Sequence, residues 1–333
     1  MGGLARKATI INESKTDSNF LLILDSGDLF FPKNTLIPGK DNLDHAKVRC
    51  KIIIDSYNAM GCDAFSPGSR DFAMGLSYLG KLEKMSDFNY ISCNLYNSLT
   101  STLLFDEYKI ENIDGSNVAF VGVTSSFKSD SILVKEPISE IRKTVNKLSN
   151  LSDFIILLFN GSDSDLDRLQ ESDINIDLIL RSRGSSKATE HGGRERIPLY
   201  SAGNKGKYLN KINIVKLDPN QSFVDITLEK SNIKLSNKRI NNKKKKNQPR
   251  NIPLEELYKD NPKVLADIAN HRNKIKESNE RIEKAINKIE SKKIPLNTKV
   301  ASNPNILMIV DKGMAKIPKG PPVKKHDHKG HNH

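Results

Sequence analysis

The chain has 333 residues, of which 37% are hydrophobic and none is Trp. No apolar run approaches the roughly 20 residues that a bilayer-spanning helix needs, so the composition excludes a transmembrane protein for this segment. Three cysteines, Cys50, Cys62 and Cys93, are too few and too scattered for a disulfide framework. We expect them to be buried free thiols.

The net charge of +13 is divided unevenly along the chain. Residues 1–236 hold 29 Lys and Arg against 30 Asp and Glu, whereas residues 237–333 hold 24 against 10. A basic segment on a neutral body indicates a partner-binding or attachment function more than a basic catalytic groove. Residues 1–6 lack the apolar segment of a secretory signal peptide, and the sequence leaves the compartment open.

Short apolar runs alternate with helical patterns through the first 236 residues, which predicts an α/β domain. Residues 20–24 form a run of five apolar residues, which predicts a buried strand that ends at Asp25. A helix is expected from Asp44 to Met60, with Gly61 as its stop. Further strands are expected at residues 90–93, 118–123, 154–158, 178–180, 199–202 and 212–215. Polar or Gly-containing turns follow nearly all of these strands, and such loops carry the chemistry of open α/β sheets.

The C-terminal part is predicted to contain a linker, a helix and a tail. Residues 237–250 include seven basic and no acidic residues, so we expect a basic flexible linker over 237–261. Asn261 and Pro262 favour the start of an amphipathic helix over 262–292. Its isoleucines at 268, 275, 282 and 289 repeat every seven residues, so this stripe docks on the chain itself, on a partner or on a second copy.

The tail over 293–333 is rich in Lys, Pro and His. It ends in a cluster of four histidines, His326, His328, His331 and His333. Imidazoles bind transition metals, so this cluster is a weak candidate metal site, and a low-complexity tail without function is the alternative.

Four motifs of the first domain, in order, resemble the catalytic domain of bacterial 5'-nucleotidases, which are calcineurin-like metallophosphoesterases. They lie at Gly2–Thr9, Leu24–Phe30, Met60–Phe72 and Ser201–Leu209. The resemblance spans about residues 2–217. It implies two mixed β-sheets packed face to face and flanked by helices, the metallophosphoesterase four-layer sandwich. It also implies hydrolysis of phosphate esters by two divalent ions, Mn or Zn, and a periplasmic or extracytoplasmic location.

The residues at the family's metal positions differ from the family pattern. The Asp that bridges the two metals in the family matches Asp28. The family's Gly-Asn-His-Glu motif corresponds to Gly68, Ser69, Arg70 and Asp71. The three ligand histidines of two later motifs correspond to Asn160, Arg183 and Ser185. The family's first motif, Asp-x-His, belongs upstream of Gly2 and is absent from this sequence, and neither His45 nor His191 lies at a ligand position.

One carboxylate cannot hold two divalent ions against water, so we interpret the metal centre as lost and expect no cofactor. Arg70 and Arg183 occupy two former metal positions and can satisfy the charge of Asp28 by salt bridges. Alternatively, Arg70, Arg181 and Arg183 bind an anion such as a phosphate. The C-terminal segment contains Tyr258 as its single aromatic residue, too little for the base-binding domain of the nucleotidases.

The leading hypothesis is therefore a catalytically degenerate phosphoesterase-like protein, a pseudoenzyme that acts as a binding or scaffold module. A protein partner is expected on the segment 237–333, and a phosphate-containing small molecule is a second candidate ligand. The alternative is an active metal-dependent phosphoesterase with a rearranged site or with a first strand encoded upstream. Nucleic-acid binding through Lys243–Lys246 is less favoured, because aromatic residues and a recognised module are absent.

Overall fold

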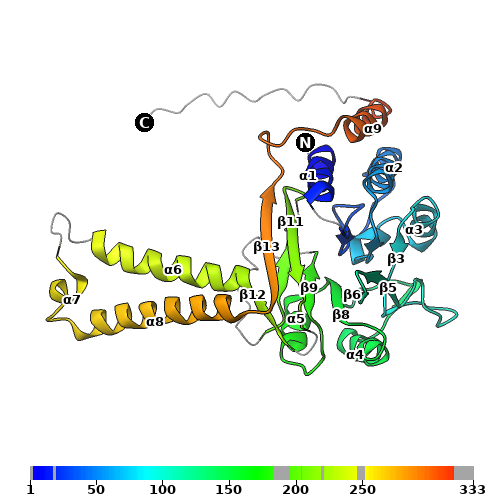
Figure 1. Cartoon of the computed structure of the whole chain (residues 1–333). Helices are drawn as coiled ribbons and strands as arrows, with labels where there is room; N and C mark the ends of the chain where they lie inside the picture. The colour runs from blue at the N-terminus through cyan, green and yellow to red at the C-terminus, as the bar shows by residue number, and fades with distance from the viewer. Residues whose placement is uncertain are drawn as a thin grey trace, which may run out of the picture.

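The computed structural model describes residues 3–17, 20–182, 196–203, 205–218, 221–245 and 252–318. An α/β body built on several β-sheets carries a long helical hairpin that projects away from it (Figure 1). Within these residues, no helix combines the length and the apolar character that crossing a membrane requires.

A five-stranded sheet forms the centre of the body, in the order β10-β9-β8-β6-β5. The four strands from β10 to β6 are parallel, and β5 pairs antiparallel with β6 at the edge. One face is covered by α4 (Pro137–Leu148) and α5 (Asp163–Gln170), whose apolar sides pack on alternate strand residues such as Ile155 and Leu157. The strands are β5 (Tyr108–Ile113), β6 (Ser116–Thr124), β8 (Phe154–Asn160), β9 (Leu178–Arg181) and β10 (Leu199–Ser201).

The opposite face of this sheet packs on two three-stranded sheets, as expected for sheets stacked face to face. Ile156 and Leu158 of β8 share a core with Ala64 and with Ile289, which come from those two sheets. One sheet is parallel, with the order β1-β2-β3, and the other is mixed, with the order β11-β13-β12. Their strands are β1 (Leu24–Asp25), β2 (Ala64–Phe65), β3 (Asn89–Tyr90), β11 (Tyr208–Val215), β12 (Phe223–Asp225) and β13 (Asn287–Pro295).

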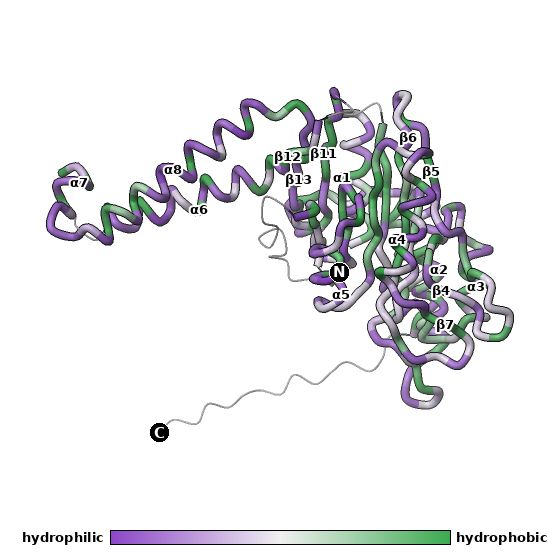
Figure 2. Tube along the Cα trace, turned by 90° about the horizontal axis from the view of Figure 1, so that it is seen from below, coloured by the Kyte–Doolittle hydropathy of each residue, from purple (hydrophilic) through white to green (hydrophobic). Residues whose placement is uncertain are grey.

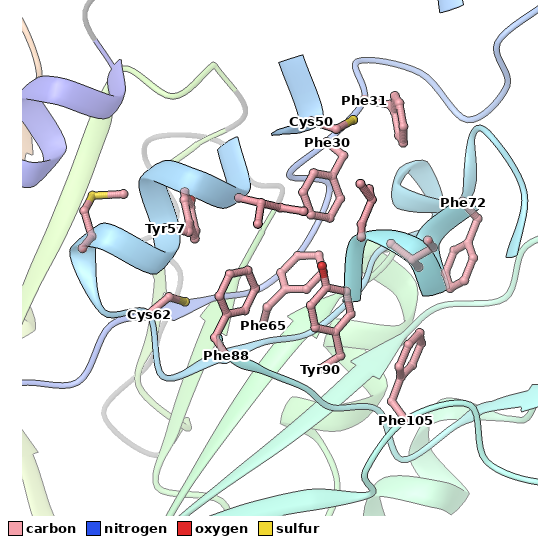
Figure 3. Packing of buried hydrophobic residues seen from close by; sticks show 14 of the residues in the cluster. Phe30, Phe31, Cys50, Tyr57, Cys62, Phe65, Phe72, Phe88, Tyr90 and Phe105 are labelled. Carbon is pink, nitrogen blue, oxygen red and sulfur yellow. The ribbon is translucent and has the colours of Figure 1, made fainter. Parts of the chain in front are cut away.

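An aromatic core joins the β1-β2-β3 sheet to the helices outside it (Figure 3). Phe65 of β2 contacts the rings of Phe30, Phe88 and Tyr90. The covering helices are α1 (Gly3–Asp17), α2 (Leu43–Met60), the 3₁₀ turn η1 (Ser69–Phe72) and α3 (Leu76–Glu83), and β4 (Leu95–Asn97) pairs with β7 (Ile132–Val134) beside them.

The expected elements of the first domain are present. Helix α2 ends at Met60, and Gly61 closes it in the left-handed conformation with φ of 75°. Each predicted strand overlaps an observed strand, although β1 and β3 are only two residues long. The prediction of a buried strand over 20–24 is wrong for most of the run, because β1 begins at Leu24 and Phe20 is exposed. All three cysteines are buried and free, as predicted, and burial raises the pKa of Cys50 to about 12.

The predicted flexible linker over 237–261 is wrong for its first nine residues. Helix α6 (Ile226–Lys245) runs through them and packs against α8 (Pro262–Lys284), with the short α7 (Leu254–Leu257) at the tip. Ile240 and Leu254 form a small core with Ile268 of α8, so burial of apolar side chains stabilises a helix that the local charge disfavours. We call this hairpin the arm (Figures 1 and 2).

The predicted helix over 262–292 is too long at its C-terminal end. Asn261 caps α8 by accepting a hydrogen bond from the Val264 amide, as expected, but the helix ends at Lys284. Ala285 adopts an extended conformation and leads into β13. The heptad pattern misled the prediction because Ile289 is buried between the sheets, whereas Ile268 and Ile275 dock on the arm core.

The predicted tail also contains regular structure. Residues 293–295 complete β13, and α9 (Pro304–Met314) packs on α1 and α2. A Cβ atom built on Gly313 lies 2.2 Å from Cγ1 of Ile52, so any larger residue at this crossing forces the Ile52 side chain or the helix to shift. The segment after the arm therefore returns to the body. The four histidines of the tail lie outside the described residues.

Candidate functional site

The turn after β1 and the turn after β2 meet at the carboxylate of Asp71. This buried side chain accepts hydrogen bonds from the amides of Asp28 and Gly68 on Oδ2, at 2.7 and 2.8 Å, and from the amide of Phe30 on Oδ1, at 2.9 Å. Burial raises the pKa of Asp71 to about 7, against the three donors, which favour the charged form. Asp71 therefore clamps the two turns together, and its hydrogen-bonding capacity is used inside the protein.

Asp28 lies at the tip of the first turn, in the left-handed conformation with φ of 59°. Its Oδ1 accepts a hydrogen bond from the backbone amide of Arg70 at 3.1 Å, and its Oδ2 lies 3.9 Å from the Arg70 Nε. The side chain of Asp28 is largely buried, with 8% exposure. A guanidinium group thus stands beside the carboxylate at which the resemblance places a metal bridge.

Asn160 reaches the same place from the end of β8. Its amide nitrogen donates a hydrogen bond to Ser182 Oγ at 2.8 Å. A Cβ atom built on Gly68 lies 2.1 Å from Asn160 Nδ2 and 2.5 Å from Asp28 Oδ1, so the three residues converge on one point. The structure therefore brings Asp28, Arg70, Asp71 and Asn160 together, with Ser69 in the same turn, whereas Arg183 and Ser185 lie outside the described residues.

Arg181 ends the neighbouring strand β9. Its Nη2 donates to the carbonyl oxygen of Gly161 at 3.0 Å and forms an ion pair with Asp163 at 2.6 Å. Arg181 and Arg70 both line a cavity of about 410 Å³. The residues that line its polar part include Lys7, Asp25, Ser26, Asp28, Tyr57, Ser182 and Tyr208.

The sequence did not predict a second set of hydrogen-bonded polar residues in this cavity, formed by Lys7, Tyr57 and Asp25. Tyr57 of α2 donates its hydroxyl proton to Asp25 Oδ2 at 2.6 Å and accepts a hydrogen bond from Lys7 Nζ at 2.7 Å. Burial and the neighbouring Asp25 raise the pKa of Tyr57 well above its usual value. Lys7 and Asp25 lie inside two of the resemblance motifs, but Tyr57 reads as one more apolar-face residue of the predicted helix.

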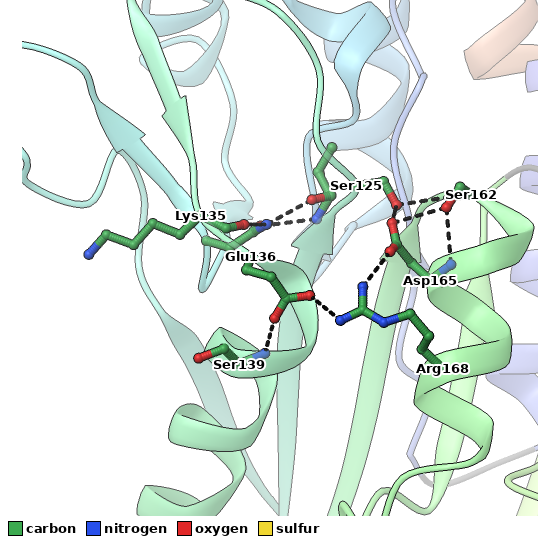
Figure 4. A network of polar contacts seen from close by, with 9 residues as sticks. Ser125, Lys135, Glu136, Ser139, Ser162, Asp165 and Arg168 are labelled. Carbon is green, nitrogen blue, oxygen red and sulfur yellow. Dashed lines mark hydrogen bonds and ion pairs between the residues drawn. The ribbon is translucent and has the colours of Figure 1, made fainter.

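A further polar network lies at the ends of β6 and β8 (Figure 4). Arg168 bridges Asp165 and Glu136, and Asp165 also accepts hydrogen bonds from the hydroxyls of Ser125 and Ser162. Glu136 caps α4 by accepting from the amide of Ser139 at 2.7 Å. The carboxylates of Asp165 and Glu136 therefore already interact with Arg168 and with the N-terminal ends of α5 and α4.

The acidic residues around this cavity are not arranged to bind a pair of divalent ions. A two-metal centre needs several carboxylate and imidazole ligands that converge on the ions. Asp71 is bound to three amides, Asp25 to Tyr57, and Asp28 faces Arg70. In the part of the chain that the structure describes, no group of three or more His, Cys, Asp and Glu residues is placed to hold a metal ion.

Comparison with known proteins gives distant relatives, and no family model matches the chain. The snake venom 5'-nucleotidase of Gloydius brevicauda is 25% identical over 245 residues, which are 64% of this chain and 40% of that protein. The 5'-nucleotidase of Vibrio parahaemolyticus is 28% identical over 163 residues, which are 43% of this chain and 28% of that protein. The chain thus matches less than half the length of these relatives.

Solved structures give the fold. The calcineurin-like phosphoesterase YfkN from Bacillus subtilis superposes with a TM-score of 0.61 at 16% identity, over 94% of this chain and 89% of that chain. A 5'-nucleotidase precursor from Thermus thermophilus gives a TM-score of 0.54 at 19% identity, over 66% and 46%. The chain is a distant homologue of the 5'-nucleotidases, and its fold is similar to that of calcineurin-like phosphoesterases.

Proposed function

We propose that this chain is a binding module on a phosphoesterase fold and does not hydrolyse phosphate esters through two metal ions. The observation that carries the proposal is the position of Arg70, whose guanidinium lies beside the buried Asp28. A fixed positive charge offsets a buried carboxylate, and a divalent ion placed there meets electrostatic repulsion from the guanidinium.

The use of Asp71 supports the same proposal. This residue occupies the position of the family's Glu, yet it points its oxygens at three backbone amides and stabilises the turns of the site. These three hydrogen bonds occupy both carboxylate oxygens of Asp71, so the side chain holds the turns together in the place where a metal ligand would have to face an ion.

We further propose that the arm is the part that contacts a protein partner. Lys234, Lys238 and Lys245 are exposed and share the face of α6 that points away from α8. Glu229, the only acidic residue of α6, is buried in an ion pair with Arg281 at 3.0 Å. An acidic protein surface would complement this basic face, whereas the body has almost no net charge.

Hydrolysis assays on the full chain test the proposed loss of catalysis. The four tail histidines are changed to Ala, so that they bind no added metal, and the protein is incubated with Mn²⁺ or Zn²⁺ and with p-nitrophenyl phosphate or a nucleoside monophosphate. We expect no turnover that depends on Asp28. Hydrolysis that disappears in Asp28→Asn, but persists in the exposed control Asp130→Asn, contradicts the proposal and supports an active phosphoesterase with a rearranged site.

A further inference from the structure

The cavity between β1, β9 and β11 is lined by two arginines whose buried Nε atoms lack a hydrogen-bond partner in the described residues. Buried polar atoms without a partner are rare in folded proteins, and each one calls for an explanation, such as a water molecule, an ion or a bound ligand. In the described residues, the Nε atoms of Arg70 and Arg181 are two of the few buried side-chain nitrogens that lack a hydrogen-bond partner. Both arginines line the same cavity.

The side chain of Arg181 is more buried and more tightly held than that of Arg70. Its side chain is 9% exposed, and Nη2 is held by the Gly161 carbonyl oxygen and by Asp163. These contacts fix the plane of the guanidinium, and they leave Nε without an acceptor. A guanidinium that is held in place loses little conformational entropy when it binds an anion.

Arg70 offers the second set of donors. Its side chain is 31% exposed, and its single ion pair in the described residues is the 3.9 Å contact with Asp28, which is too long for a hydrogen bond. Lys7 supplies a third cation to the cavity lining, where the described acidic residues are Asp25 and Asp28. Asp25 already accepts hydrogen bonds from Tyr57 and from the Gly27 amide, and Asp28 accepts one from the Arg70 amide. The three cations of the lining outnumber these two carboxylates, so the lining favours an anionic ligand.

We infer that this cavity binds a small oxyanion directly through Arg70 and Arg181, without a metal ion. The inference rests on the proposed function, because it takes Arg70 as a replacement for the metal centre. The flat donor fork of arginine suits phosphate, sulfate and carboxylate groups. A volume of about 410 Å³ exceeds what an inorganic ion fills, and Tyr200 and Tyr208 are also among the lining residues, so the ligand is a small organic molecule that carries the oxyanion.

Calorimetric titration of the full chain in excess EDTA tests this inference. The probes are inorganic phosphate, inorganic sulfate, glycerol phosphate and acetate, and their relative affinities identify the oxyanion. We expect saturable binding of at least one probe, with glycerol phosphate tighter than inorganic phosphate if phosphate is the recognised group. Arg70→Gln should weaken that binding by about tenfold or more, because one charged hydrogen-bonding group is lost.

Arg142→Gln is the matched control, since Arg142 is an exposed arginine that pairs with Asp173 on the surface. This variant should bind like the unchanged protein. Because Arg181→Gln disturbs a buried contact, Arg181→Lys serves as the second variant and should also weaken binding while the chain stays folded.

Three results overturn the inference. If no probe binds in EDTA and no hydrolysis is detected, the oxyanion site is refuted and the proposed function stands. If binding requires Mn²⁺ or Zn²⁺ and is abolished by EDTA, both the oxyanion site and the proposed function are refuted. Equal binding by the unchanged protein and Arg70→Gln also overturns the inference, since the anion then binds elsewhere.

Discussion

Replacing Gly68 with Ala tests whether Asp28 and Asn160 really converge at the site. A Cβ atom on residue 68 lies 2.1 Å from Asn160 Nδ2, 2.5 Å from Asn160 Cγ and 2.5 Å from Asp28 Oδ1. All three distances are far shorter than a van der Waals contact. The φ of Gly68 is −98°, which any residue adopts, so the cost of the substitution is steric and does not come from backbone strain.

The expected loss is about 1–3 kcal/mol of unfolding free energy, the usual cost of inserting a methyl group into a packed site. Gly80→Ala is the matched control. Gly80 lies inside α3 with no heavy atom within 4 Å of the added Cβ, so this variant should gain about 0.5–1 kcal/mol from helix propensity. Both values are measured by urea unfolding. If Gly68→Ala is as stable as the unchanged protein, the strand-end loops do not meet as described and the candidate site is wrong.

The remaining predictions concern Asp71, the arm and α9. Folding raises the pKa of Asp71 from 3.8 to about 7, so its contribution to stability is full below pH 3.8 and is lost as the pH rises toward 7. Urea unfolding between these pH values should therefore show a falling free energy of unfolding in the unchanged protein and a smaller fall in Asp71→Asn. Parallel pH dependences of the two proteins would refute the raised pKa of Asp71. Ile268→Ala should destabilise the arm by about 2–5 kcal/mol, measured as faster hydrogen exchange in α6 and α8. The exposed control Leu235→Ala should change stability by no more than about 0.5 kcal/mol, and equal effects of the two would contradict the docking of α8 on α6. Gly313→Ala should lower the free energy of unfolding by about 1–3 kcal/mol, because the added methyl group clashes with Ile52. In the double variant, Ile52→Ala should make room for this methyl group, so the combined loss should be smaller than the sum of the two single losses. Strictly additive losses would contradict the contact between α9 and α2.

Elements with strong local patterns could be predicted from the sequence. The strand at 154–158 is a continuous apolar run, and the strand at 118–123 is interrupted only by Gly122; the structure places both in the central sheet and buries nearly all of their residues. Helix α2 has a clear start, an apolar face and a terminal Gly61, and it was predicted to within one residue. The convergence of Asp28, Arg70 and Asn160 followed from the order of the family motifs, not from any local signal.

The elements that could not be predicted depend on contacts between distant residues. Residues 237–245 are rich in Lys and Asn, and their helix forms because Ile240 packs on Ile268. The strand β13 was concealed because Ile282 and Ile289 continue the seven-residue spacing of the preceding helix. The contacts of Tyr57 with Lys7 and Asp25 join residues 50 and 32 positions apart, and single-sequence patterns contain no information about such pairs.

The metal content of the protein tests the central claim most directly. The full chain, with the four tail histidines changed to Ala, is incubated with Mn²⁺ or Zn²⁺, desalted, and measured by elemental mass spectrometry. If Arg70 has replaced the metals beside Asp28, the bound metal should stay far below one equivalent, and Asp28→Asn should not change it. About two equivalents, lost in Asp28→Asn, would contradict the account and show that a two-metal centre is retained.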